Sequence, residues 1–138
     1  MQSLTYKVED GFATIAASGS YSQAFNCLVG VENEDKHLPC IVSNVTSVAK
    51  FNPYFDQYTI NCDITIKQRL AKNNTNLDEL DENKEEMYNK IATSGSMVDN
   101  YTTGLGIKDF DVNGQSTSIT GNVLAHTISV TVLAHSTE

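Results

Sequence analysis

The clearest pattern in the chain is a two-residue alternation over residues 58–69. Polar side chains occupy every second position, and the positions between them are apolar or weakly polar. One set is Tyr58, Ile60, Cys62, Ile64 and Ile66, and the other is Thr59, Asn61, Asp63, Thr65, Lys67 and Arg69. This period is typical of a strand with one face in a core and the other in water or against a polar partner. The pattern therefore predicts a long strand with one polar face.

Two segments show helical spacing instead. Leu4, Val8, Phe12 and Ile15 recur at the period of an amphipathic helix, which predicts a helix over residues 3–17, although Gly11 weakens the pattern. A second helix is predicted to begin at a cap on Thr75 or Asn76 and to end at Ser94 and Gly95. Its predicted buried stripe, interrupted by Lys84, is Leu77, Leu80, Met87, Tyr88 and Ile91.

The rest of the chain favours further strands. β-branched and alternating stretches predict strands at 25–31, 40–50, 101–112 and 123–135, and Asn113-Gly114 predicts a type I′ turn. We expect one α+β domain over residues 1–138, with residues 95–122 as an extended loop or hairpin insertion. Its antiparallel sheet should have about four to five strands, with the N-terminal helix and one long central helix packed on one face.

Composition narrows the classes of function. The chain has 138 residues and a net charge of −8, and its nine basic residues are scattered. Because proteins that bind nucleic acid rely on clustered Lys and Arg, we expect no specific nucleic-acid binding. No stretch approaches the roughly 20 apolar residues needed to span a bilayer, and the first residues do not resemble a signal peptide. We therefore expect no membrane association.

The cysteines are predicted to be free thiols. Cys27, Cys40 and Cys62 have apolar neighbours and form no CxxC pair, so they are interpreted as buried thiols in a reducing compartment rather than as zinc ligands. Cys62 falls on the apolar face of its strand. Burial there raises the pKa of a thiol and disfavours a nucleophilic role.

No catalytic constellation is apparent from the spacing. His126 lies on the apolar face of an alternating strand, with no partner placed to complete a site, and is interpreted as structural. His37 and His135 are predicted to be solvent residues. The carboxylates of residues 78–86 would spread around a helix rather than converge on a cation, and the glycines at 104–106 match no phosphate loop. We expect no enzyme, no cofactor, no metal site and no catalytic residue.

The remaining candidates for function are two charged surfaces. One is the polar face of the strand at 58–69 and the other is the acidic helix that follows it. The candidate interface residues are Lys67, Arg69, Asp78, Glu79, Asp81 and Glu82. A solvated surface is the simpler interpretation of either one alone, but a bare sheet face in a small domain often meets another subunit.

The order of these segments resembles a known family. It runs from "LPCIV" (38–42) to "FNPYFDQYTINCDITIKQR" (51–69), then "NLDELDENKEEMYNKI" (76–91), and closes with "HTISVTVLAH" (126–135). This order is similar to that of the tail terminator and related head–tail joining proteins at the neck of tailed bacteriophages. The glycine usual before the long strand is replaced by Phe55-Asp56-Gln57, and residues 95–122 have no clear counterpart, which leaves the position in the neck or tail open.

The resemblance implies a structural virion protein, made in the host cytoplasm and located in the tail or neck. Such proteins form rings, commonly hexamers, that cap the tail tube and join it to the head. The implied partners are other copies of the chain, the tail tube protein and head-completion or connector proteins. The alternative is a small-molecule or peptide-binding α+β domain in a larger assembly, with a pocket lined by Phe12, Phe25 or Phe51.

Overall fold

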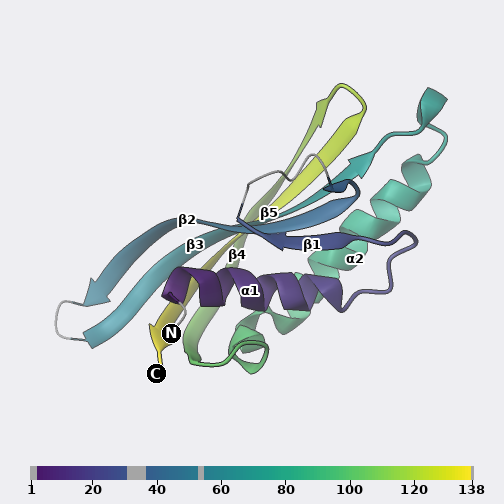
Figure 1. Cartoon of the computed structure of the whole chain (residues 1–138). Helices are drawn as coiled ribbons and strands as arrows, with labels where there is room; N and C mark the ends of the chain where they lie inside the picture. The colour runs from purple at the N-terminus through teal and green to yellow at the C-terminus, as the bar shows by residue number, and fades with distance from the viewer. Residues whose placement is uncertain (1–2, 31–36, 53–54, 138) are drawn as a thin grey trace.

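The protein is described from a computed structural model that covers residues 3–30, 37–52 and 55–137. The helices and strands follow one another in the order drawn in Figure 1. The elements are α1 (Leu4–Ala17), β1 (Asn26–Val29), β2 (Cys40–Asn52), β3 (Phe55–Arg69), η2 (Lys72–Asn74), α2 (Leu77–Ser94), η3 (Gly95–Asn100), β4 (Leu105–Thr120) and β5 (Val123–Ser136).

The five strands form one sheet in the order β1-β2-β3-β5-β4. The pairs β2–β3, β3–β5 and β5–β4 are antiparallel, and only β1 runs parallel to its neighbour β2. The α+β class with a mostly antiparallel sheet, an N-terminal helix and one long later helix is therefore confirmed.

The core lies between one face of the sheet and the two helices. Ile64 pairs with Ile128 and Ile60 with Val132, so the apolar faces of β3 and β5 form one continuous layer. Figure 1 shows α1 crossing in front of the sheet, with α2 farther toward the end of β3. The predicted alternation on β3 is confirmed from Ile60 onward, where Ile60, Cys62, Ile64 and Ile66 are fully buried and the polar positions between them are not, whereas Tyr58 is half-buried.

The helix α1 lies close to η3 because of a glycine. Val8, Phe12 and Ile15 are fully buried, as the helical spacing predicted. A Cβ at Gly11 would come within 2.6 Å of the Val98 Cγ2 atom, so only glycine allows this approach without a shift. Gly11, which weakened the helix prediction, is therefore explained by packing.

The buried stripe of α2 differs from its prediction. Leu80, Met87 and Ile91 are fully buried, but Leu77 in the first turn is 44% exposed and Tyr88 is half-buried, and Asn83, which was not predicted, is buried. The N-cap is Asn76, one of the two predicted residues, but it makes no side-chain cap bond. Its side chain instead accepts a hydrogen bond from the Ala71 N–H and donates one to the Arg69 carbonyl.

The predicted turn at Asn113-Gly114 is wrong. Both residues lie inside β4, at a shift in register between Val112 and Gly114. The chain reverses at Gly121, which has a positive φ of 61°, and Asn122. Asn113 occupies the extra position of the bulge, and its side chain donates to the Thr131 hydroxyl on β5. Residues 95–122 thus comprise η3, one long strand of the sheet and the start of this turn.

Candidate interaction surface and buried polar network

The sheet face that points away from the helices is lined by short polar side chains, and we refer to it as the open face. On β3 it is formed by the polar set of the alternation, and on β5 by the residues paired with that set. Asn61 pairs with Thr131, Asp63 with Ser129, and Thr65 with Thr127. The side chains of this central part of the open face are half-buried by one another: Thr59, Asn61, Asp63, Thr65, Thr127, Ser129 and Thr131.

Hydrogen bonds link these side chains across four strands. The Asn61 Nδ2 atom donates to the Ser47 Oγ atom on β2 at 2.7 Å, and the Asn61 Oδ1 atom accepts from the Thr131 hydroxyl at 2.6 Å. The same Thr131 hydroxyl accepts from Asn113 on β4. Polar groups that pair with one another are less available to an external ligand, so the open face is polar but largely self-satisfied.

Two further pairs extend this pattern along the strands. The Ser129 hydroxyl donates to the Asp63 Oδ1 atom at 2.8 Å, and the hydroxyls of Thr65 and Thr127 lie 2.9 Å apart. Cross-strand Thr–Thr pairs and hydroxyl–carboxylate pairs each add modestly to sheet stability. They also hold the open face in a fixed arrangement.

The charges of the open face are mixed. Asp109 and Asp111 on β4 line a shallow hollow of about 260 Å³ together with neighbours on β3 and β5. Lys67 and Arg69 lie farther along β3, opposite Ala125 and Val123, with Lys67 half-buried and Arg69 exposed. The full lining of the hollow is Thr59, Asp109, Asp111, Asn113, Thr131 and Leu133.

The predicted interface residues fall on two different sides of the sheet. Lys67 and Arg69 belong to the open face, whereas the acidic candidates belong to α2, which covers the other face. Among the acidic residues Asp78, Asp81 and Glu82 are exposed and Glu79 is half-buried. Asp81 forms an ion pair with Lys84 at 3.2 Å. The fold therefore gives the basic and acidic groups separate surfaces rather than one combined site.

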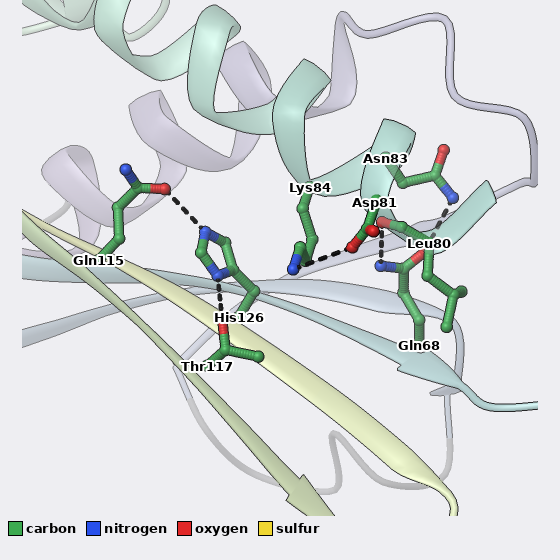
Figure 2. A network of polar contacts seen from close by, with 8 residues as sticks. All are labelled: Gln68, Leu80, Asp81, Asn83, Lys84, Gln115, Thr117 and His126. Atoms are coloured by element: carbon green, nitrogen blue, oxygen red, sulfur yellow. Dashed lines mark hydrogen bonds and ion pairs between the residues drawn. The ribbon is translucent and has the colours of Figure 1, made fainter. Parts of the chain in front are cut away.

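A buried polar network fixes α2 to the end of β3 (Figure 2). Gln68 is fully buried, and its Nε2 atom donates to the Leu80 carbonyl at 3.1 Å. Its Oε1 atom accepts from the Asn83 Nδ2 atom at 2.8 Å and from the Gln23 Nε2 atom at 3.1 Å. The Asn83 Oδ1 atom in turn accepts from the backbone N–H and the hydroxyl of Ser22. This network joins three segments that are distant in sequence.

A second set of polar contacts surrounds His126, which is 7% exposed (Figure 2). Its Nε2 atom lies 2.9 Å from the Gln115 Oε1 atom, and its Nδ1 atom lies 2.7 Å from the Thr117 hydroxyl oxygen. An amide oxygen only accepts, so Nε2 carries the proton and Nδ1 accepts from Thr117. Burial lowers the pKa of His126 below its ordinary value of 6.5, and the Lys84 ammonium lowers it further.

The contacts of His126 join β5 to β4. Both ring nitrogens have neutral partners from β4, the Gln115 amide and the Thr117 hydroxyl, and no carboxylate is among those contacts. A hollow of about 410 Å³ lies between α2 and the β4–β5 hairpin beside it. Its lining is Asp81, Lys84, Glu85, Tyr88, Gln115 and His126.

The sequence did not identify Gln68 and Asn83 as important residues. One signal was present: Gln68 continues the apolar set of the β3 alternation after Ile66, so its parity placed it toward the core. A glutamine at such a position needs partners, because burying an amide without hydrogen bonds is costly. Nothing local in the sequence showed that Asn83 would supply one.

The thiols and the other histidines match the predictions in part. Cys40 and Cys62 are buried and Cys27 is half-buried, all three as thiols rather than disulfides, and burial raises the pKa of Cys62 to about 12. His37 is exposed, as predicted. The solvent position predicted for His135 is wrong, because this residue is half-buried with its ring against Gly106. The absence of a side chain on Gly106 leaves room for the imidazole.

The pocket predicted for a small-molecule or peptide-binding domain, lined by Phe12, Phe25 or Phe51, is only partly present. Phe12 is fully buried, with its ring centroid 6.0 Å from that of Phe110, so it belongs to the core. Phe25 lines a hollow of about 510 Å³ beside β1. The side chain of Phe51 lies outside the described part of the chain.

Comparison with known proteins identifies no relative: no protein-family model and no curated protein matches the chain. Over the described residues, the helices are all too short or too polar to cross a membrane. In the same part of the chain, no three His, Cys, Asp or Glu side chains are grouped so as to hold a metal ion.

Proposed function

We propose that this chain is a structural protein of a tailed bacteriophage virion. In this proposal it is a neck or tail-terminator subunit that forms a ring, caps the tail tube and joins it to the head. The observation that supports this most is the one-sided architecture: α1 and α2 cover one face of the sheet, and the other is a broad polar face. A ring wall built this way presents its helices outward and its open face to a central lumen.

The chemistry of the open face suits a lumen through which DNA moves. Its hydroxyl and amide groups bond to one another, and its carboxylates at Asp63, Asp109 and Asp111 offset the cations at Lys67 and Arg69. Strong attachment to phosphates requires a cluster of Lys and Arg, and such a cluster would slow DNA that must slide. The net charge of −8 also disfavours strong attachment to DNA phosphates.

Ring formation requires heterologous contacts, in which one patch meets a different patch on the next copy. Lys67 and Arg69 at the end of β3 and the acidic residues at the start of α2 are complementary in charge. Both groups lie at the same end of the sheet, at the rim of such a ring, where neighbouring copies can bring them together. Contacts of this kind mainly set registry and encounter rate. The acidic residues in question are Asp78, Glu79, Asp81 and Glu82.

The first test is the solution mass of the purified protein by light scattering, with negative-stain images of the same fraction. We expect a closed oligomer, and we expect Lys67→Glu with Arg69→Glu to reduce its formation. Lys72→Glu with Lys90→Glu is the matched control, because it changes the net charge equally at positions off the open face. Equal assembly of the two double variants would contradict the assignment of Lys67 and Arg69.

The second test addresses the virion role itself. The chain should bind the end of tail tubes assembled from the tail tube protein of the same phage, measured by co-sedimentation. Failure to bind both tube ends and head-completion proteins would contradict the neck assignment. A strong, salt-dependent affinity of the assembled ring for duplex DNA would contradict the proposed lumen.

A further inference from the structure

Apart from the short β1, the sheet leaves two strand edges without a neighbouring strand in the described part of the chain. One is the outer edge of β4, the last strand in the order β1-β2-β3-β5-β4. The other is the second half of β2, because β1 pairs only with Cys40–Ser43. Since the Val45 N–H donates to the Glu9 carboxylate of α1 at 2.7 Å, residues 46–52 are the part of this edge without a neighbouring segment among the described residues. In each antiparallel edge strand, alternate residues direct their backbone N–H and C=O groups away from the sheet.

The far half of the β4 edge lacks the usual protection. Natural edge strands avoid pairing with other chains by means of charged residues, prolines or bulges. Residues 114–120, GQSTSIT, contain no charge and no proline, and both register shifts of β4 lie before them. Each of these seven residues is exposed. Such an edge is suited to accept a further strand.

The direction of the strands makes another copy of the chain a suitable partner. Successive antiparallel pairings from β2 through β3 and β5 to β4 make β4 run opposite to β2. If a second copy in the same orientation lies beside β4, its β2 meets β4 in the antiparallel sense. The two free edges of one molecule are therefore complementary between copies, and the contact is heterologous.

Apolar side chains flank both edges on the same face of the sheet. Val48 on β2 is 46% exposed and Ile119 on β4 is 62% exposed. Val48 pairs with the buried Ile60, and Ile119 pairs with the buried Leu124, so both point to the face covered by the helices. Strand pairing between copies would bring these two apolar positions near one another and remove them from water.

We propose that copies of this chain join through strand pairing between residues 114–120 of β4 and residues 46–52 of β2 on the next copy. The result is a sheet that continues from subunit to subunit. This inference rests on the proposed ring and names the surface that closes it. The proposed strand pairing offsets neighbouring copies along the strand direction, as the tilted strands of a closed sheet require. Lys50, the one charged residue in the β2 segment, pairs with Asp56 of its own hairpin.

Hydrogen exchange on the full-length protein tests the proposal directly. Amides in residues 114–120 and 46–52 should both become slower to exchange when the protein concentration is raised and the mass increases, because both edges gain hydrogen bonds together. Rapid exchange of either segment in the oligomer would overturn the proposal. A protein that stays monomeric at every concentration would overturn it too.

Three single variants separate the edges from other surfaces. We expect Val48→Lys and Ile119→Lys each to weaken self-association by about tenfold, since each removes one buried apolar contact between copies. Met97→Lys is the matched control, because Met97 is 48% exposed but belongs to η3 and not to an edge strand. Circular dichroism and thermal melting of the variants establish that each monomer is folded.

The outcomes distinguish this inference from the proposed function. If assembly survives Val48→Lys and Ile119→Lys but is lost on reversal of Lys67 and Arg69, copies join through charged patches and the edge pairing is overturned. If edge variants abolish assembly but no tail tube is bound, the pairing stands and the neck assignment fails. Equal losses for Met97→Lys and the edge variants would overturn the pairing.

Discussion

At the scale of single residues, the polar groups of the interior carry much of the specificity of the fold. Gln68 is fully buried, and its amide contacts Leu80, Asn83 and Gln23 from two other segments. A buried amide of this kind contributes little net free energy, but removing one partner leaves the others unsatisfied. The Gln68 amide therefore favours one position of α2 on the sheet, the one in which all of these hydrogen bonds form.

The Gln68 network can be tested with a side chain of similar size. Gln68→Met should lower the free energy of unfolding by about 2 kcal/mol, because Asn83 and the Leu80 carbonyl lose a buried partner. Gln57→Met, at a half-buried position where the amide has no hydrogen-bond partner in the described part of the chain, should cost about 0.5 kcal/mol or less. Urea denaturation of both variants measures the difference. Similar losses at the two positions would contradict the role given to Gln68.

His126 gives the protein a predicted pH dependence. Its pKa is lowered in the folded chain by burial and by Lys84, so the unfolded chain takes up a proton at a higher pH. The contribution of His126 to the free energy of unfolding is therefore present above pH 6.5 and is lost as the pH falls below that value. In urea denaturation between pH 7.5 and pH 5, His126→Gln should show a smaller decline than the wild type. An unchanged slope would refute this.

At the scale of elements, close approach decides where helices lie. The α1 helix contains Gly11 at its contact with η3, where Val98 occupies the space that a larger side chain would need. The α2 helix is placed by its polar contacts with β3 as well as by Leu80, Met87 and Ile91. Helix propensity alone would favour neither arrangement.

Gly11→Ala tests the packing of α1. Alanine is favoured over glycine by about 1 kcal/mol inside a helix, but overpacking a core contact costs about 1–3 kcal/mol. Because Val98 is fully buried and its Cγ2 atom would lie 2.6 Å from the new Cβ, we expect a net loss of stability. In a double-mutant cycle, Gly11→Ala should lower the free energy of unfolding less when Val98→Ala is already present. A raised melting temperature for Gly11→Ala would show that the contact relaxes.

At the scale of the whole molecule, the sheet is covered unevenly. The centre of β3 and β5 is paired on both sides and covered by helices, whereas residues 46–50 and 113–120 are exposed. The open face is polar and self-satisfied, and the two free edges have complementary directions. Uncovered strand edges of this kind are suited to contacts with neighbouring subunits.

Native-state hydrogen exchange of the monomer should reproduce this unevenness. The slowest amides are expected at Ile60–Ile66 and Ile128–Val132, since exposing them requires global unfolding. Residues 113–120 should exchange much faster, through local opening of the hairpin. Mass spectrometry of dilute protein measures both regions, and uniform protection across the sheet would contradict the described architecture.

Most of the elements could be predicted from the sequence, because their signals are local. The alternation of β3 and β5 and the spacing of Leu4, Val8, Phe12 and Ile15 each repeat within one segment, so the core-facing side of each element follows from parity or period. The turn at Asn113-Gly114 was predicted wrongly because a bulge and a turn use the same residue types.

By itself, the sequence determined the α+β class, the two helices, the long polar-faced strand and the free thiols, since all of these depend on residue type and local period. Only the tertiary structure decided that Gln68 meets Asn83, that β1 runs parallel to β2, and that β2 and β4 keep free edges of opposite direction. Those features depend on contacts between segments that are far apart in sequence, and local patterns carry no record of which segments will meet.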